Sequence, residues 1–339
     1  MITGGLVDIQ VNGFAGVDFN SSDLTPEVLD HALEVMLATG VTTCLPTIIT
    51  AYPDELEARF TALDRCVNSS RLGPLMCPGY HLEGPFLNPA QGFSGCHPAG
   101  AMTAADPALV THLQSKIKRP ILLTTVAPEI SGGLDFIRAM AAQSILVSIG
   151  HSSADFAMVE AAVQAGATMS THLGNGLPQS LPKLDNPLFA QLGEDRLLAT
   201  FIADGIHLPP KALKSLIRAK GFERSALVTD AVAAAAVPAG TYDFAGMRIE
   251  RTGDGMVRLP GTTGLAGSSL RLDEAVRNLV RWNIASFEQA IEMASTRLLG
   301  ALAPALRARK ITLPHTEIEW SDSMAIRSVR IGRKIRNYN

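Results

Sequence analysis

Residues 145–173 have the sequence ILVSIGHSSADFAMVEAAVQAGATMSTHL. The stretch begins and ends with an apolar run of strand length, and residues 154–165 between the two runs have the spacing of an amphipathic helix. A strand, a helix and a second strand in this order predict a βαβ unit whose two strands are parallel. His151 directly follows the first strand, and His172 lies at the end of the second. The stretch therefore predicts a parallel sheet with polar side chains gathered where its strands end.

The same alternation of apolar runs and helical stretches continues along most of the chain. Eight runs of strand length occur at 6–12, 42–49, 76–83, 121–126, 145–150, 168–173, 198–204 and 226–230. Stretches with helical spacing occur at 26–38, 53–66, 105–117, 154–165, 210–219, 270–282 and 286–299. Eight βα units are the number that closes a barrel, so we predict an α/β fold of the (β/α)8 TIM-barrel type. We also expect a β-hairpin insertion over 241–259, turning at Gly253-Asp254-Gly255, and short strands over 316–336.

The composition excludes several classes of protein. The chain has 339 residues, of which 47% are hydrophobic, enough for one large core. Its 29 basic and 32 acidic residues give a net charge of −3 without long runs of one sign, so neither nucleic acid nor a membrane is expected as a partner. The four cysteines form no CxxC pair, and no stretch looks like a secretory signal or approaches the ~18 apolar residues of a membrane span. We therefore expect a soluble, cytoplasmic protein.

Several of the predicted strands end in residues that bind metals or move protons. These residues are Asp8, Gln10, His81, Glu83, His151, His172, Asp204 with His207, and Asp230. Each of them alone is more readily explained as an ordinary hydrogen-bonding, turn or capping residue. Catalytic groups of a TIM barrel, however, come from strand C-termini and the loops that follow them. The agreement across strands predicts that Glu83, His151 and His172 supply O, N and N ligands to Zn²⁺ or another first-row divalent ion.

A metal held in this way needs a proton carrier beside it. Such a metal lowers the pKa of its bound water and polarises an amide carbonyl. Asp230, at the end of the last strand, is our candidate for taking a proton from the water and delivering it to the departing amine. His97, in the loop after Glu83, is our candidate for stabilising the developing oxyanion. The residues together predict amide hydrolysis with one metal ion.

Nine motifs, each weak alone, occur in one order along residues 4 to about 300. They are GLVDIQVNG (5–13), HLEGPFLN (81–88), GCHP (95–98), VAPE (126–129), SIGHSSA (148–154), THLGNG (171–176), IADGIHL (202–208), LVTDA (227–231) and LAGSSL (265–270). In this order the set resembles the N-acetylglucosamine-6-phosphate deacetylase family of the amidohydrolase superfamily. The resemblance implies a barrel domain of the metal-dependent amidohydrolase type over 4–300.

The resemblance also implies roles around the metal. Glu83, His151 and His172 match the family's metal ligands, and Asp230 matches its catalytic acid/base. Gln10 stands where many amidohydrolases begin an HxH motif, and strand 121–126 lacks the lysine of two-metal relatives. The family pattern thus implies one divalent ion with Gln10 at or near it. Zinc is the preferred ion, and iron, cobalt and manganese are alternatives.

For the substrate, the resemblance implies hydrolysis of the N-acetyl group of N-acetylglucosamine 6-phosphate to glucosamine 6-phosphate and acetate in amino-sugar catabolism. Its implied substrate contacts are His97 at the acetamido carbonyl, His207 near the sugar phosphate, Asn175 and Gly176 at the phosphate, and Ala266, Gly267 and Ser268 on the far wall. Turn chemistry is the alternative for these loop residues. Two other functions stay open, a deacylase of another N-acetylated amino sugar and a non-catalytic sugar- or metal-binding relative.

The sequence departs from the family pattern at two places. Lys183 stands where the family has an arginine that reaches the phosphate across a homodimer interface, and lysine lacks the two-point grip of arginine. The chain also begins almost at the first barrel strand. Residues 301–339 are therefore expected to form the remnant of a small β-sandwich that relatives build from both chain ends.

Overall fold

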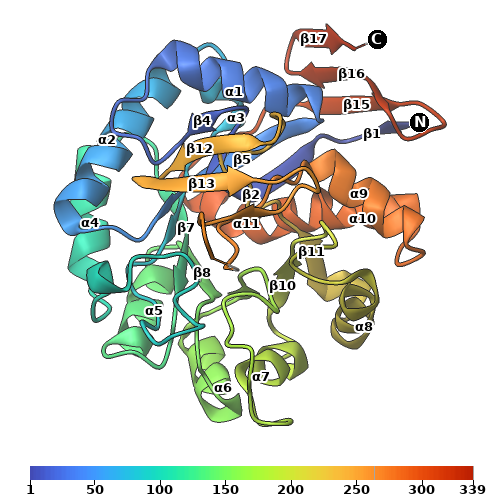
Figure 1. Ribbon diagram of the computed structural model, residues 1–339. Helices are drawn as coiled ribbons and strands as arrows, with labels where there is room; N and C mark the ends of the chain where they lie inside the picture. Colours follow the sequence, from blue (N-terminus) through green and yellow to red (C-terminus); the bar gives the residue numbers. More distant parts are fainter. Residues whose placement is uncertain (263, 339) are drawn as a thin grey trace.

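The computed structural model describes residues 1–262 and 264–338, and its centre is a parallel sheet of eight strands curved into a barrel (Figure 1). In spatial order the strands are β2 (Leu6–Val11), β5 (Val41–Ile49), β6 (Tyr80–Glu83), β7 (Ile121–Val126), β8 (Leu146–Ile149), β9 (Met169–Ser170), β10 (Leu198–Phe201) and β11 (Ser225–Leu227). An isolated parallel bridge between Val11 and Ala231 joins the first strand to the segment after the last. All eight predicted strands and the predicted fold class are confirmed.

Helices surround the barrel and connect its strands. They are α1 (Pro26–Ala38), α2 (Pro53–Ser69), α3 (Gly73–Met76), α4 (Pro107–Lys116), α5 (Gly133–Ala142), α6 (Phe156–Ala165), α7 (Pro187–Gly193), α8 (Pro210–Lys220), α9 (Leu272–Arg281), α10 (Phe287–Met293) and α11 (Thr296–Ala308). Several begin at a side chain that accepts a hydrogen bond from the first turn, such as Thr25, Asp106 and Asp155. A cap of this kind stabilises a helix by about 1 kcal/mol.

The predicted single helix over 286–299 is wrong. The chain forms α10 and α11 instead, with a break at Ala294–Ser295, and α11 continues to Ala308. The break has a physical reason, because the Ser295 hydroxyl donates to the carbonyl of Gly5 at 2.6 Å. This hydrogen bond ties the helix pair to the start of β2.

Both ends of the chain contribute to a small antiparallel sheet. Its order is β1 (Ile2–Thr3), β15 (Thr316–Trp320), β16 (Ile326–Ile331) and β17 (Lys334–Asn337). Trp320 is buried, and its indole N–H donates to the Thr3 hydroxyl at 2.8 Å. The expected small sheet from the chain ends is confirmed.

The segment expected as a hairpin insertion forms three strands, β12 (Gly240–Phe244), β13 (Met247–Arg251) and β14 (Val257–Arg258). The predicted turn at Gly253-Asp254-Gly255 joins β13 to β14. A second turn at Ala245–Gly246, which the sequence analysis did not predict, joins β12 to β13. Figure 1 shows β12 and β13 lying over the barrel near β4 (Val17–Asp18), which pairs with β3 (Gly13–Phe14).

Within the described part of the chain, no helix combines the length and the apolar composition needed to cross a membrane.

Candidate functional site

A cavity of about 470 Å³ opens at the C-terminal ends of the barrel strands. Its walls come from the loops after β6, β8, β9, β10 and β11 and from the hairpin segment. The lining includes Asn12, Ile49, Glu83, Cys96, His97, His151, His172, Asn175, Gly176, Gln179, Ile206, His207, Asp230, Phe244, Leu259 and Gly267. The structure therefore gathers most of the predicted site residues from separate loops into one cavity.

Glu83, the last residue of β6, lies at the centre of the polar cluster and is buried. Its Oε1 atom is 3.2 Å from Nε2 of His172 and 3.5 Å from Nε2 of His151. The side-chain amide of Gln10 also donates to Oε1 at 3.0 Å. Burial alone would raise the pKa of Glu83, but the contacts to the two imidazoles hold that pKa well below its usual range. Glu83 is therefore a carboxylate facing two imidazole nitrogens.

A hydrogen bond at Nδ1, the ring nitrogen that does not face Glu83, sets the orientation of His151. Its Nδ1 lies 2.7 Å from the carbonyl oxygen of Phe93, which can only accept, so Nδ1 carries the proton. Nε2 of His151 then presents a lone pair toward Glu83 and has no hydrogen-bond partner among the described residues. Such a hydrogen bond on the outer ring nitrogen is the usual support of a metal-ligating histidine.

The donor set around Glu83 fits a single divalent ion. Glu83, His97 and His151 each offer a ligand atom, and these atoms lie within 4.8 Å of one another. His172 contacts the same carboxylate oxygen, and the His151 and His172 ring centroids are 4.9 Å apart. One carboxylate oxygen with several imidazole nitrogens is a set that zinc and its first-row neighbours bind.

Asp230 lies on the edge of this cluster, just beyond β11. Its Oδ1 accepts hydrogen bonds from Asn12 Nδ2 at 2.7 Å and from Gln10 Nε2 at 3.3 Å. Burial, reinforced by the negative charge of Glu83, raises the pKa of Asp230 to about 6. A carboxyl group with a pKa near neutrality can both accept and return a proton, as acid–base catalysis requires.

Three of these residues have left-handed backbone conformations. The φ angles are 51° at His151, 31° at His172 and 50° at Asp230. Residues other than glycine rarely adopt positive φ, and those that do concentrate at active sites, where surrounding contacts hold them. At Asp230 these contacts are its N–H to the Gln10 carbonyl and its carbonyl to the Ser268 N–H, both at 2.9 Å. The strained backbone conformations thus occur at residues that were candidates from the sequence alone.

His81 and Asp8, expected at strand ends, lie within β6 and β2, are buried, and do not line the cavity. Nε2 of His81 is 2.8 Å from the Thr125 hydroxyl, and burial lowers the pKa of His81 to about 4. The Asp8 carboxylate accepts from the Thr229 hydroxyl at 2.6 Å. These two residues connect neighbouring strands within the barrel core.

The predicted substrate residues divide into two groups. His97, Asn175, Gly176, His207 and Gly267 line the cavity. His207 is held by Asp204, whose Oδ2 lies 2.6 Å from His207 Nδ1.

The second group does not line the cavity that the described residues enclose. Lys183 is exposed, whereas Ala266 and Ser268 are buried. Gln10, predicted at or near the metal, is also buried and does not line the cavity. The Ser268 hydroxyl donates to the Thr229 carbonyl at 2.6 Å, so Ser268 supports the Asp230 segment from behind.

Several residues that line the cavity had no role predicted from the sequence, among them Asn12, Ile49, Phe244 and Leu259. Asn12 had a usable signal, because it follows Gln10 by two positions and therefore faces the same side of a strand. Ile49, Phe244 and Leu259 had none, since a single apolar residue on a strand or hairpin does not reveal which cavity it lines.

Replacing Gly176 with alanine is expected to weaken metal binding. Gly176 has φ of +62°, and a Cβ there would lie 2.8 Å from Nδ1 of His151, on the side of the ring that Phe93 holds. The imidazole would have to move, and displaced supporting contacts typically cost roughly tenfold in metal affinity. Competitive metal titration would measure the change.

Gly193→Ala is the matched control, because no described atom lies within 4 Å of a Cβ built at Gly193. Equal metal affinity in the Gly176→Ala and control proteins would contradict the expected displacement of His151.

Comparisons with known proteins show which family the chain resembles. No family model matches the chain. The N-acetylgalactosamine-6-phosphate deacetylase of Escherichia coli O157:H7 is 34% identical over 318 residues, covering 91% of this chain and 82% of that protein. The N-acetylglucosamine-6-phosphate deacetylase of Bos taurus is 35% identical over 328 residues, covering 91% and 76%.

A solved structure extends the likeness to the fold. It is that of an N-acetyl-D-glucosamine-6-phosphate deacetylase mutant from Mycobacterium smegmatis in complex with N-acetyl-D-glucosamine-6-phosphate. The TM-score is 0.87 at 25% identity, and the match covers 98% of this chain and 86% of that one. This chain therefore belongs to the N-acetylglucosamine-6-phosphate deacetylase family of the amidohydrolase superfamily and is an amide-hydrolysing deacetylase.

Proposed function

We propose that this enzyme removes the N-acetyl group of an N-acetylhexosamine 6-phosphate, with N-acetylglucosamine 6-phosphate as the substrate and glucosamine 6-phosphate and acetate as the products. The observation that carries the proposal is the placement of Asp230 beside the Glu83 cluster in one cavity. Proteins similar to this chain are named for deacetylation of both the glucosamine and the galactosamine compound.

Glu83, His151 and His172 would hold the single divalent ion, and Gln10, whose amide donates to Glu83 Oε1, would support that ligand. We take zinc as the preferred ion, with iron, cobalt and manganese as alternatives. A bound ion of this kind polarises the amide carbonyl and lowers the pKa of water. The support for His172 is that its Nε2 lies closer to Glu83 than that of His151, at 3.2 Å against 3.5 Å.

The chain's own residues then move the proton. Ionised Asp230 removes a proton from the water that attacks the acetyl carbon, and returns it to the nitrogen as the C–N bond breaks. His97 stays neutral because burial, helped by the neighbouring His151, lowers its pKa to about 3. Its Nδ1 lies 2.9 Å from the Thr50 hydroxyl, whose other acceptor is the Glu83 carbonyl at 3.4 Å. Donation by Thr50 to the nearer Nδ1 would leave Nε2–H free to donate to the acetamido oxygen.

The opposite part of the cavity would bind the sugar phosphate through His207, Asn175 and Gly176, and Gly267 would form part of the wall. The hydrogen bond between His207 and Asp204 fixes the imidazole for this contact. Lys183 is exposed and is not among the residues that line the cavity of its own chain. This placement supports a homodimer, in which Lys183 would approach the phosphate bound by a neighbouring chain.

Acetate release from three compounds tests the substrate: N-acetylglucosamine 6-phosphate, N-acetylgalactosamine 6-phosphate and unphosphorylated N-acetylglucosamine. We expect loss of the phosphate to lower kcat/KM by about 100-fold, because charge-assisted hydrogen bonds at the phosphate would be lost. Equal kcat/KM values with and without phosphate would contradict the proposal and favour a deacylase of another N-acetylated sugar. A preference for the galactosamine compound would correct the hexose.

A further inference from the structure

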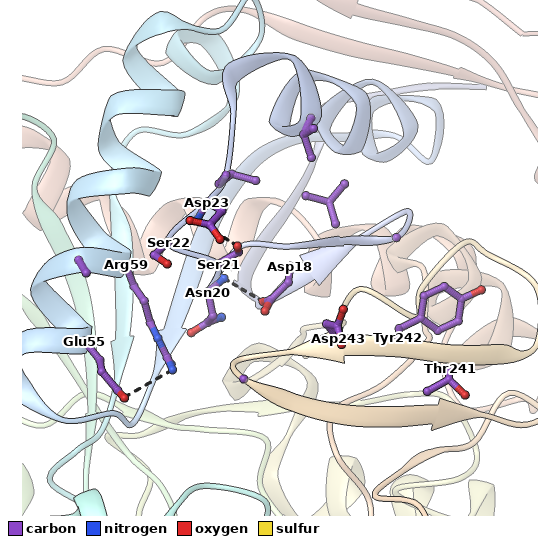
Figure 2. A pocket seen from close by; sticks show the side chains of 16 residues that line it. Asp18, Asn20, Ser21, Ser22, Asp23, Glu55, Arg59, Thr241, Tyr242 and Asp243 are labelled. Carbon is purple, nitrogen blue, oxygen red and sulfur yellow. Dashed lines mark hydrogen bonds and ion pairs between the residues drawn. The ribbon is translucent and has the colours of Figure 1, made fainter.

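A second cavity, of about 640 Å³, is also bordered by the β12–β13 hairpin (Figure 2). Its walls come from the loop after β4, from α2 and from β12. Its polar lining includes Asp18, Asn20, Asp23, Glu55, Arg59 and Asp243. Figure 2 shows Asp18 and Arg59 extending from different elements toward the turn end of the hairpin. We call these two residues the turn anchor.

The turn that they approach has an unfavourable sequence. Ala245 and Gly246 both have positive φ, 52° and 84°, as in the two-residue turns that suit β-hairpins. Glycine adopts this conformation freely, whereas the Cβ of Ala245 makes it costly. Asparagine, aspartate or glycine is usual at such a position. The conformation of Ala245 therefore depends on contacts from outside the hairpin.

The turn anchor supplies these contacts. The N–H of Ala245 donates to Oδ2 of Asp18 at 2.7 Å, and its carbonyl accepts from Nη2 of Arg59 at 3.3 Å. Both backbone polar groups of the strained residue are therefore bonded to the turn anchor. Glu55, one helical turn before Arg59, lies 3.7 Å from the same guanidinium group.

The turn anchor is itself tied to the barrel. Oδ1 of Asp18 accepts from the backbone N–H of Asn20 at 2.9 Å. The Asn20 side chain bridges to β5, accepting from the N–H of Ile49 at 2.9 Å and donating to the carbonyl of Thr47 at 3.0 Å. Ile49 in turn lines the catalytic cavity. A short chain of hydrogen bonds thus connects the hairpin turn with the catalytic end of the barrel.

The hairpin carries a wall of the catalytic cavity. Phe244, directly before the turn, is buried and lines that cavity. It belongs to a separate apolar cluster with Ile49, Val232, Ala234, Ile249, Val257 and Ala266. Since Val232 follows Asp230 by two residues, a shift of the turn would move an apolar wall that packs next to the catalytic segment.

We propose that Asp18 and Arg59 are positioning residues, which hold the Ala245–Gly246 turn and so keep Phe244 in place against the substrate. They act through the hairpin and do not touch the reacting atoms. The effect should therefore appear in KM, with kcat little changed. This inference rests on the proposed function only for the substrate used in the kinetic assay.

Asp18→Ala in the full-length enzyme tests the proposal by two measurements. We expect KM to rise by about 5- to 10-fold, the effect of one lost hydrogen bond, with kcat within about twofold of wild type. Asp18→Asn keeps a side-chain oxygen that can accept from Ala245, so most of the wild-type KM should return. Arg59→Met, which keeps the apolar stem but loses the donor, should also raise KM and serves if Asp18→Ala does not fold. Asp23→Ala, an acid of the same cavity without contact to the turn, should leave KM unchanged.

Amide hydrogen exchange of residues 240–251 is the second measurement, and it needs no substrate. Asp18→Ala should speed exchange there by about tenfold relative to wild type and to Asp23→Ala, while the barrel strands stay protected. Unchanged exchange and unchanged KM in Asp18→Ala would overturn the proposal. A wild-type enzyme without activity on any sugar phosphate would overturn the proposed function alone, since the exchange result would still decide the role of the turn anchor.

Discussion

Replacing Asp230 with asparagine is expected to lower kcat for amide hydrolysis by at least ~100-fold, the usual contribution of general acid–base catalysis. Asparagine can still accept the hydrogen bond from Asn12 Nδ2, which is 2.7 Å from Oδ1 in the native protein, so the local structure should persist. It cannot take up a proton from water. Acetate release under saturating substrate would measure kcat, and metal content measured on the same protein should equal that of wild type.

The pH dependence of the wild-type enzyme belongs to the same prediction. Only ionised Asp230 accepts a proton, and its pKa is raised to about 6, so kcat/KM should fall as the pH decreases through that region. A bound cation stabilises the carboxylate and moves the fall to lower pH. Asp23→Asn, the same exchange at an exposed acid, is the control. An Asp230→Asn enzyme with wild-type kcat would remove Asp230 from the mechanism.

Replacing His172 with asparagine should remove the metal together with activity, whereas His97→Asn should keep the metal and lose rate. For His172→Asn we expect metal affinity to fall on the order of 100-fold or more. Even the loss of a residue that only hydrogen-bonds to a metal ligand typically lowers metal affinity 10- to 100-fold. For His97→Asn we expect kcat to fall by about 10²–10³, the cost of one oxyanion donor. Metal content by elemental analysis and kcat of metal-loaded protein separate the two effects.

The geometry makes this pair of variants decisive. Glu83, His97 and His151 form a group of potential ligands within 4.8 Å, so His97 is the structural competitor of His172. The Thr50 hydroxyl next to His97 Nδ1 can donate or accept, and its role decides whether Nε2 of His97 carries a proton or a lone pair. Metal loss in His97→Asn with metal retained in His172→Asn would assign the third ligand to His97. In the wild-type enzyme, chelation should remove the activity and readdition of zinc should restore it, whichever histidine is the third ligand.

The fold was largely predictable because the barrel strands are buried on all sides. All nine residues of β5 are buried, and such strands appear in the sequence as continuous apolar runs. Three helices were missed for local reasons, and one of them, α3, has only four residues. α7 has seven residues, too few for the apolar spacing of a helix to be recognised in the sequence. α5 begins at Gly133 after Gly132, without a side-chain cap. The break at Ser295 arises from a contact with Gly5, which local sequence does not reveal.

The catalytic site was predictable where polar residues stand at strand ends, since parallel strands bring their C-termini together. Glu83, His151, His172 and Asp230 all follow this rule. The rule says nothing about segments that reach the site from elsewhere. Phe244 arrives on a hairpin inserted after the last barrel strand, and its position depends on hydrogen bonds to Asp18 and Arg59. Because Asp18 and Arg59 are far from Ala245 in the sequence, local sequence patterns do not reveal that they hold the turn.

The pairing of β1 with β15 determines when the molecule can finish folding during synthesis. Met1 and Trp320 exchange two backbone hydrogen bonds, of 2.9 Å and 2.8 Å. At roughly 5–20 residues per second, a ribosome needs about 15 to 60 s to add the residues between them. Throughout that time the edge of β1 has no partner and stays available to other chains. Residues 1–5 should therefore be among the last to become protected, and a ribosome stalled before Trp320 would carry a chain in which β1, outside the barrel, still lacks its partner strand.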